Sequence, residues 1–392
     1  MDRKTVKEVL KEDRQRRRAG KRRRLMQVLA ILTCFVMLVA VMYGGLTLYT
    51  MFQDRQEKSQ EEGVNALDLD DDGNVVDGYG NTVSVMSDAV VYSQEELDAK
   101  VAEAVLAAQM EAFEPVLEAI KLGLTDGDTV LETLRPFYPD DIIVVSGGKY
   151  HFVPINYDLN QNSFQTENLN FLESGEVQYL KDGEVISHKG IDVSKFQGDI
   201  DWNLVAQDGV EFAFIRVGNR GWGSEGKLME DDNFAANIEG AMAAGIKVGV
   251  YFYSQAVNEQ EVLEEADLVL QKIAPYNIEC PVVFDVEKVS NANGRMNNIS
   301  VEERTNLTLL FCQTIENAGY KPMIYHNTEM GALMLNLEPL EGYDKWFASY
   351  SDTMYYPYEY KIWQYSSTGH VQGISAEVDL NISFTPFWEI VE

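Results

Sequence analysis

The stretch Pro281-Val282-Val283-Phe284-Asp285-Val286-Glu287 is an apolar run that ends on two acids. It predicts a buried strand, and side chains at i and i+2 of a strand point to one face about 6 to 7 Å apart, so Asp285 and Glu287 should share a site. Like charges that close do not both ionise easily, which raises one pKa and leaves a proton donor beside a charge stabiliser. Cleavage of a glycosidic bond needs such a pair. The alternative is an edge strand whose acids lie in solvent.

The region 190–392 around this stretch alternates apolar strands with helical patterns. Helices are expected at 232–244, 259–273 and 301–318, each before a Gly or Pro stop. Strands are expected at 190–196, 212–218, 246–254, 281–287, 322–326, 346–350, 361–365 and 378–382. Eight strands with interposed helices indicate an α/β fold, a TIM-like β/α barrel. The later connections are too short for full helices, so the barrel should be irregular in its second half.

The acids of this region fall where a barrel would use them, because barrel chemistry lies at the carboxyl ends of the strands. Asp285 and Glu287 close the fourth predicted strand, and Asp192 falls in the first. Asp379 lies in the last strand, which neighbours the first if the barrel closes. Four acids on three separate strands that converge on one mouth are hard to explain as solvated side chains.

Several motifs of this region resemble those of one known family. The segment 190–202, Gly-Ile-Asp-Val-Ser-Lys-Phe-Gln-Gly-Asp-Ile-Asp-Trp, is similar to the opening motif of the family 25 glycoside hydrolases, the muramidases or lysozymes of the Chalaropsis type. Further matches follow in the expected order: Phe214-Ile215-Arg216-Val217-Gly218, Val250-Tyr251-Phe252-Tyr253-Ser254, Val283-Phe284-Asp285-Val286-Glu287, Ile362-Trp363-Gln364-Tyr365-Ser366 and Val378-Asp379-Leu380-Asn381. The similarity extends over 190–388 and covers nothing before Gly190.

The resemblance implies hydrolysis of the β-1,4 bond between N-acetylmuramic acid and N-acetylglucosamine in the glycan strands of peptidoglycan. By position, Glu287 would be the general acid, and Asp285 would stabilise the developing charge or orient a participating N-acetyl group. Asp192 and Asp379 would complete the acidic floor of the cleft. Aromatic faces stack on sugars and amides bind hydroxyls, so the candidate substrate contacts are Tyr253, Tyr325, Trp346, Trp363 and Gln364, each with a purely structural alternative. Arg216 is a further candidate at the site and should pair with an interior acid.

The two ends of the chain face different environments. Residues 1–24 hold twelve Lys or Arg and four Asp or Glu, a net charge of +8, so the formal charge of −31 leaves −39 on the remainder. Residues 25–52 are apolar and long enough to cross a hydrocarbon core of roughly 30 Å as one helix. The positive-inside rule then places the N-terminus in the cytoplasm and the catalytic region outside a cell, expected to be bacterial. The stretch is too long for a cleaved signal peptide and lacks a cut site of small residues. A nucleic-acid role for the basic tail is not expected, because its position favours orientation and contact with anionic lipid.

Between the span and the barrel, three segments are distinguished. Residues 53–92 form an acidic linker, in which the Asp68-x-Asp70-x-Asp72-Gly73 spacing imitates a calcium loop but has Tyr79 at the twelfth position, where a Glu is required. Residues 93–139 form a helical stalk that begins at a capping box and is kinked or ended by Pro115; it either oligomerises or packs on the next segment. Residues 140–189 form a small β-rich module with two hairpins.

Other chemistries have little support. The four histidines, His151, His188, His326 and His370, lack metal-ligand spacing, and no Gly-rich phosphate loop opens a helix, so neither a metal nor a cofactor is expected. His326 either lines the cleft or is structural. Cys280 and Cys312 form the possible disulfide outside the span, or are small buried side chains. The alternative function is a catalytically silent scaffold that binds peptidoglycan, although clustered acids are costly for a binding module.

Overall fold

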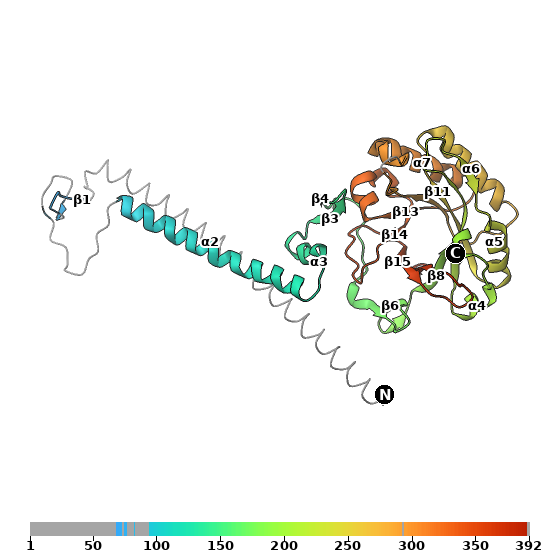
Figure 1. The fold of residues 1–392 in the computed structure, drawn as a ribbon, viewed down its shortest axis with the longest axis horizontal. Helices are drawn as coiled ribbons and strands as arrows, with labels where there is room; N and C mark the ends of the chain where they lie inside the picture. The colour runs from blue at the N-terminus through green and yellow to red at the C-terminus, as the bar shows by residue number, and fades with distance from the viewer. Residues whose placement is uncertain (1–67, 73, 77–81, 83–93, 292–293, 390–392) are drawn as a thin grey trace, which may run out of the picture. The chain divides into compact units, whose positions relative to one another are not determined.

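The computed structural model describes residues 68–72, 74–76, 82, 94–291 and 294–389 (Figure 1). The basic tail, the expected membrane span at 25–52 and most of the linker lie outside these residues. Within the described ranges, no helix is long and apolar enough to cross a membrane. The chain divides into two compact units, Met1–Phe137 and Tyr138–Glu392.

The described part of the first unit is a two-stranded hairpin followed by helices. Strands β1 (Asp68–Leu69) and β2 (Val75–Val76) pair antiparallel around a turn in which Asp70 accepts hydrogen bonds from the backbone of Asn74 at 2.7 Å and Asp72 at 3.1 Å. The acids of the calcium-like spacing therefore belong to a hydrogen-bonded turn. The helix predicted for the stalk is α2 (Gln94–Thr125), which continues through Pro115. A short helix, α3 (Val130–Leu134), follows behind a capping box.

The second unit is built on a closed barrel of eight strands. In ring order these are β8 (His188–Val193), β9 (Phe212–Arg220), β11 (Lys247–Ser254), β12 (Val282–Val286), β13 (Pro322–Asn327), β14 (Asp344–Ala348), β15 (Ile362–Gly369) and β16 (Val378–Ser383). A ninth strand, β10 (Leu228–Glu230), pairs with β9 outside the ring. All eight predicted barrel strands are present within a few residues of their expected bounds.

The last strand departs from a regular β/α barrel. The seven ring strands from β8 to β15 run parallel, but β16 is antiparallel to both of its neighbours, β15 and β8. Only eight residues, 370–377, join β15 to β16, and a parallel crossover needs a dozen or more, so the chain turns back on itself. Asp379 consequently reaches the mouth from the amino end of its strand, in register with Asp192.

Helices cover the outer side of the first half of the barrel (Figure 1). They are α4 (Trp202–Gln207), α5 (Phe234–Ala243), α6 (Glu259–Ile273) and α7 (Val301–Asn317). After β13 the helices shorten to a π-helical turn (Met330–Met334) and a 3-10 turn (Glu338–Leu340), which confirms the irregular second half. Buried apolar side chains such as Val262 and Phe311 fill the layer between strands and helices. A second cluster, which includes Phe212, Phe214 and Trp346, fills the barrel interior.

Residues 138–189 belong to the same compact unit as the barrel. Both predicted hairpins are present: β3 (Asp141–Ser146) with β4 (Lys149–Pro154), and β6 (Val177–Lys181) with β7 (Glu184–Val185). Strand β5 (Leu169–Phe171) adds to β6. Leu159, Val177 and Tyr179 share the hydrophobic core of the barrel, so this segment and the barrel fold around one core.

Candidate active site

A cleft of about 650 Å³ opens at the carboxyl ends of the parallel strands. That volume lies within the range of about 300 to 1,000 Å³ usual for ligand sites. The cleft is lined by all four predicted acids and by five of the six predicted contacts: Asp192, Asp285, Glu287, Asp379, Tyr253, Tyr325, Trp346, Gln364 and Arg216. The structure therefore brings together residues from both ends of the barrel sequence.

Trp363 is the one candidate that the structure places elsewhere. Successive residues of a strand face opposite sides, and on β15 it is Gln364 that points into the cleft. Trp363 is 1% exposed in the layer outside the barrel, and its indole Nε1 donates to the carbonyl oxygen of Ser349 at 2.8 Å. A sugar contact at Trp363 is thus not compatible with this geometry.

Asp192 is held rigidly on the cleft floor. Its Oδ2 accepts hydrogen bonds from Gln364 Nε2 and Asn381 Nδ2, both at 2.8 Å. The other end of the Gln364 amide accepts from the hydroxyls of Tyr325 at 2.8 Å and Tyr350 at 3.0 Å. Gln364 therefore positions the acid and two tyrosines. Asn381 was not among the predicted site residues, although it lies in the Val378-Asp379-Leu380-Asn381 motif.

Burial raises the pKa of all four carboxyl groups. The pKa of Asp192 lies well above its ordinary value because of desolvation and the charge of Asp379, and that of Asp285 is raised in the same way by desolvation and the charge of Glu287. Desolvation raises the pKa of Glu287 to about 7 and that of Asp379 to about 6. Because four mutually repelling acids share a desolvated site, the cluster retains protons near neutral pH.

Asp285 has an oxygen without a protein partner. Among the residues that the structure describes, nothing donates a hydrogen bond to its buried Oδ1. The side chain lines the cleft, while Oδ1 itself is buried behind the cleft surface. The charge of Arg216 opposes part of the rise in the pKa of Asp285. Its guanidinium pairs with another acid, the buried Asp231, through contacts of 2.6 and 2.7 Å. The predicted pairing of Arg216 with an interior acid is confirmed.

The aromatic lining falls into a buried floor and an exposed rim. Trp346 and Tyr325 are only 1% and 7% exposed, and Trp346 stacks on Phe214 with ring centroids 4.7 Å apart. The exposed rings are Phe196, Trp222 and Tyr350, at 71%, 48% and 61%. Large apolar surface open to solvent beside a polar cleft suits stacking on sugar faces. These three residues were not predicted, and the available signal was their position in loops that follow strands β8, β9 and β14.

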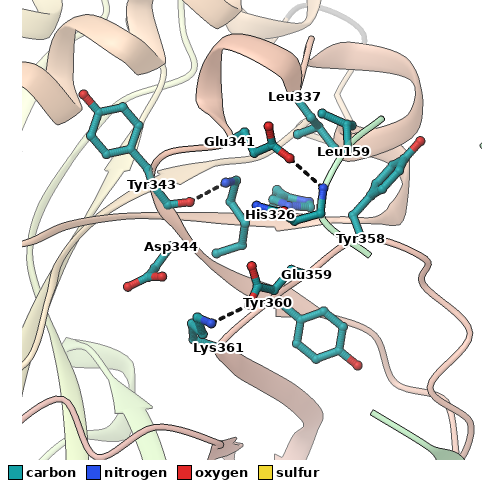
Figure 2. Close-up of a pocket in the computed structure, with 12 residues that line it drawn as sticks. Leu159, His326, Leu337, Glu341, Tyr343, Asp344, Tyr358, Glu359, Tyr360 and Lys361 are labelled. Carbon is teal, nitrogen blue, oxygen red and sulfur yellow. Dashed lines mark hydrogen bonds and ion pairs between the residues drawn. The ribbon is translucent and has the colours of Figure 1, made fainter. Parts of the chain in front are cut away.

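A second, much smaller cavity lies beside His326 (Figure 2). Its volume of about 40 Å³ holds water but no sugar. Glu341 accepts from the backbone of Asn160 at 2.6 Å, and Lys345 Nζ donates to the carbonyl oxygens of Leu340 and Tyr343. The bond to Glu341 joins Asn160 to the barrel, and Lys345 fixes the loop that carries Glu341, so the cavity belongs to a structural junction.

The buried His326 belongs to this junction and not to the cleft. Its side chain is fully buried, and desolvation lowers its pKa to about 4. Cys280 and Cys312 are both buried free thiols. They are therefore small buried side chains and do not form a disulfide. In the described part of the chain, no group of three or more His, Cys, Asp or Glu side chains is arranged to hold a metal ion.

The barrel region matches one family model and is similar to several known proteins. Residues 191–374 match the family described as Glycosyl hydrolases family 25. The autolytic lysozyme of Clostridium acetobutylicum is 28% identical over 199 residues, which cover 49% of this chain and 55% of that protein. YegX of Escherichia coli is 30% identical over 208 residues, which cover 49% of this chain and 68% of YegX. A solved family 25 glycosyl hydrolase from Bacillus anthracis is 24% identical and covers 53% of this chain and 93% of its own, with a TM-score of 0.42. The chain thus spans about half the length of the autolytic lysozyme.

Proposed function

The chain is a glycosyl hydrolase of family 25, and on that premise we propose that it is a muramidase that cleaves the β-1,4 bond between N-acetylmuramic acid and N-acetylglucosamine in peptidoglycan. The observation that carries the proposal is the convergence of four acids from three parts of the barrel on one cleft. A glycosidic bond breaks through an oxocarbenium-like transition state, which nearby carboxylates stabilise. The cleft volume suits a segment of glycan strand.

Glu287 is the proposed general acid. A general acid works best when its pKa lies near the working pH, and burial brings the pKa of Glu287 to about 7. It follows directly on strand β12, so its position is fixed by the barrel. The carboxyl group would protonate the oxygen of the leaving sugar and then serve as a base for the incoming water.

Asp285 and Asp192 are the proposed partners of that acid. Asp285 lines the cleft, where its carboxyl group would orient an N-acetyl group of the substrate or stabilise the developing positive charge. Asp192 is fixed by two amide donors and, with Asp379, completes the acidic floor of the cleft. The exposed rings of Phe196 and Tyr350 would hold the sugars at the rim.

We further propose that this enzyme is tethered to the outer face of the cell membrane by a helix at 25–52. The length of that apolar stretch and the charge of +8 directly before it support this orientation. The acidic linker and α2 would then set how far the cleft reaches into the wall. Tethering supplies a high effective concentration of enzyme near the membrane. Protease added outside intact cells should digest the residues after Phe52; a soluble form that begins shortly after Phe52 as the main species would exclude a retained anchor.

A catalytically silent scaffold is the alternative. It would retain the barrel and bind glycan without cleaving it. Four desolvated acids destabilise a fold and are of no use to a binding module, which favours the enzyme.

The test of the proposed catalytic pair uses the full chain in detergent and purified peptidoglycan. Asp285→Asn and Glu287→Gln keep the shape of each side chain but remove its charge or its transferable proton. We expect each variant to lose about 10²- to 10⁴-fold in turnover while still binding the substrate. Turnover within threefold of wild type for Glu287→Gln would exclude it as the general acid, and a wild-type chain that binds without turnover would favour the scaffold.

A further inference from the structure

Glu287 lies at the start of a segment whose position is fixed from two sides. Its carbonyl oxygen accepts a hydrogen bond from Gln255 Nε2 at 3.1 Å, and Gln255 is fully buried. Two residues on, the backbone of Val289 exchanges hydrogen bonds with Asn297, at 3.0 Å to its Oδ1 and 2.8 Å from its Nδ2. These contacts come from the family 25 region itself.

The residue between them, Lys288, contacts Glu329 of the matched family region and Ser146, which lies outside that region. Lys288 Nζ lies 2.5 Å from Glu329 Oε1 and 3.1 Å from the hydroxyl of Ser146. The Ser146 hydroxyl donates in turn to the same Glu329 oxygen at 2.5 Å. Ser146 ends strand β3 at the tip of the β3–β4 hairpin, 142 residues before Lys288 in the sequence.

From these contacts we propose that the β3–β4 hairpin is a positioning element for catalysis: through Ser146, Glu329 and Lys288 it fixes the segment that carries Glu287. The three residues are called the hairpin latch. The inference rests on the proposed function, because it assigns the latch to the reaction of Glu287. It extends the working catalytic unit from Gly190 back to the hairpin.

The structure also indicates what the latch does not do. The Lys288 and Glu329 side chains are 32% and 23% exposed, and ion pairs near the surface contribute little to stability. Lys288 is not among the groups that shift the pKa of Glu287. The effect of the latch should therefore be geometric, since displacement of a reacting group by about 1 Å can reduce a rate 10²-fold.

The experiment compares four variants of the full chain in detergent, with kcat and KM measured on soluble glycan fragments and Tm measured in parallel. Ser146→Ala should lower kcat about fivefold and Lys288→Met about tenfold, with KM within twofold, because only the alignment of the acid is loosened. Ser146→Thr keeps the hydroxyl and should restore kcat to within twofold of wild type. Ser187→Ala is the matched control, because Ser187 accepts a backbone hydrogen bond at 2.9 Å beside the amino end of β8, away from Lys288.

Three results would overturn the proposal. One is a kcat for Ser146→Ala within twofold of wild type, and another is an equal loss in the Ser187→Ala control. The third is a shift of the pH–rate profile in Lys288→Met, which would show that Lys288 acts through its charge and not through alignment of Glu287. Absence of turnover in the wild type would instead refute the proposed function.

A readout independent of turnover keeps the latch testable in that case. Amide hydrogen exchange of the peptide 287–291 should accelerate about tenfold in Ser146→Ala and remain unchanged in Ser187→Ala. The reason is that the Val289 amide directly follows Lys288, and its hydrogen bond to Asn297 should open more often when the latch is lost. Unchanged exchange in Ser146→Ala overturns the inference whatever the activity.

Discussion

The substitution Glu287→Gln should stabilise the folded protein at alkaline pH while it removes activity. The pKa of Glu287 is raised from 4.5 to about 7, so the folded state binds this proton more tightly than the unfolded state does. The free energy of unfolding therefore falls as pH rises from about 4.5 to about 7. At 1.36 kcal/mol per pKa unit the loss is about 3 kcal/mol, present in full above pH 7 and absent below pH 4.5.

Chemical unfolding of the full chain in detergent at pH 5 and pH 8 measures this effect. Any difference in packing between amide and acid is the same at both pH values, so the change between them is the informative quantity. We expect Glu287→Gln to gain about 2 kcal/mol more at pH 8 than at pH 5 relative to wild type. In a thermal scan this difference corresponds to roughly 4 to 8 °C for a unit of this size.

The control is Glu302→Gln, which alters an exposed acid in the first turn of α7. It should change stability by similar small amounts at both pH values. A gain for Glu287→Gln that does not depend on pH, or a loss at pH 8, would refute the assignment of Glu287 as a desolvated acid that holds its proton near neutrality.

Three further predictions concern groups in and behind the cleft. Turnover should fall above about pH 7 as Glu287 loses its proton and below about pH 6 as the remaining carboxylates, Asp379 among them, become neutral; a rate that stays constant to pH 8 in a pH–rate profile would contradict this. Because burial lowers the pKa of His326 from 6.5 to about 4, the unfolded state takes up its proton first, and stability should fall by about 3 kcal/mol as pH drops through that window; His326→Gln should remove this slope in urea unfolding, and a slope equal to wild type would refute it. Asn381→Leu leaves Asp192 without one of its two amide donors and should cost about 1 to 3 kcal/mol in urea unfolding together with most of the turnover, whereas wild-type activity would show that Asp192 needs no such support.

The sequence predicted the barrel well because its strands are apolar and its helices periodic. Each expected strand and helix in 190–392 has a counterpart, since burial on both faces leaves a strong pattern. Strand direction has no such signal. The reversal of β16 follows from the short connection before it, and only that length could have revealed that Asp379 enters the cleft from an amino end.

The site residues that lie in sequence motifs on strands could be predicted, whereas those that lie on loops could not. The four acids lie on strands or directly after them, so their meeting follows from the fold. Phe196, Trp222 and Tyr350 line the rim because of loop conformation, which a single sequence does not encode in any short pattern. The prediction for Trp363 was wrong because the strand is apolar and buried on both faces. Its sequence does not show which alternate residues point into the barrel, and the register alone decides this.

For the β3–β4 hairpin, the sequence predicted the local turn but not the contact with a distant part of the chain. The pair Gly147-Gly148 predicted the turn, and both glycines adopt positive φ, at 57° and 75°. The contact of Ser146 with Lys288 joins positions that are 142 residues apart and depends on the way the hairpin packs on the barrel. A local pattern carries no information on that distance.

The most direct test of the central claim is the identity of the reducing ends that the enzyme creates. Purified peptidoglycan would be digested with the full wild-type chain and with Glu287→Gln, reduced with borohydride, and analysed by mass spectrometry. We predict new reducing ends on N-acetylmuramic acid with the wild type and an at least 100-fold lower yield with Glu287→Gln. New reducing ends on N-acetylglucosamine, or equal yields from both proteins, would contradict a muramidase in which Glu287 is the general acid.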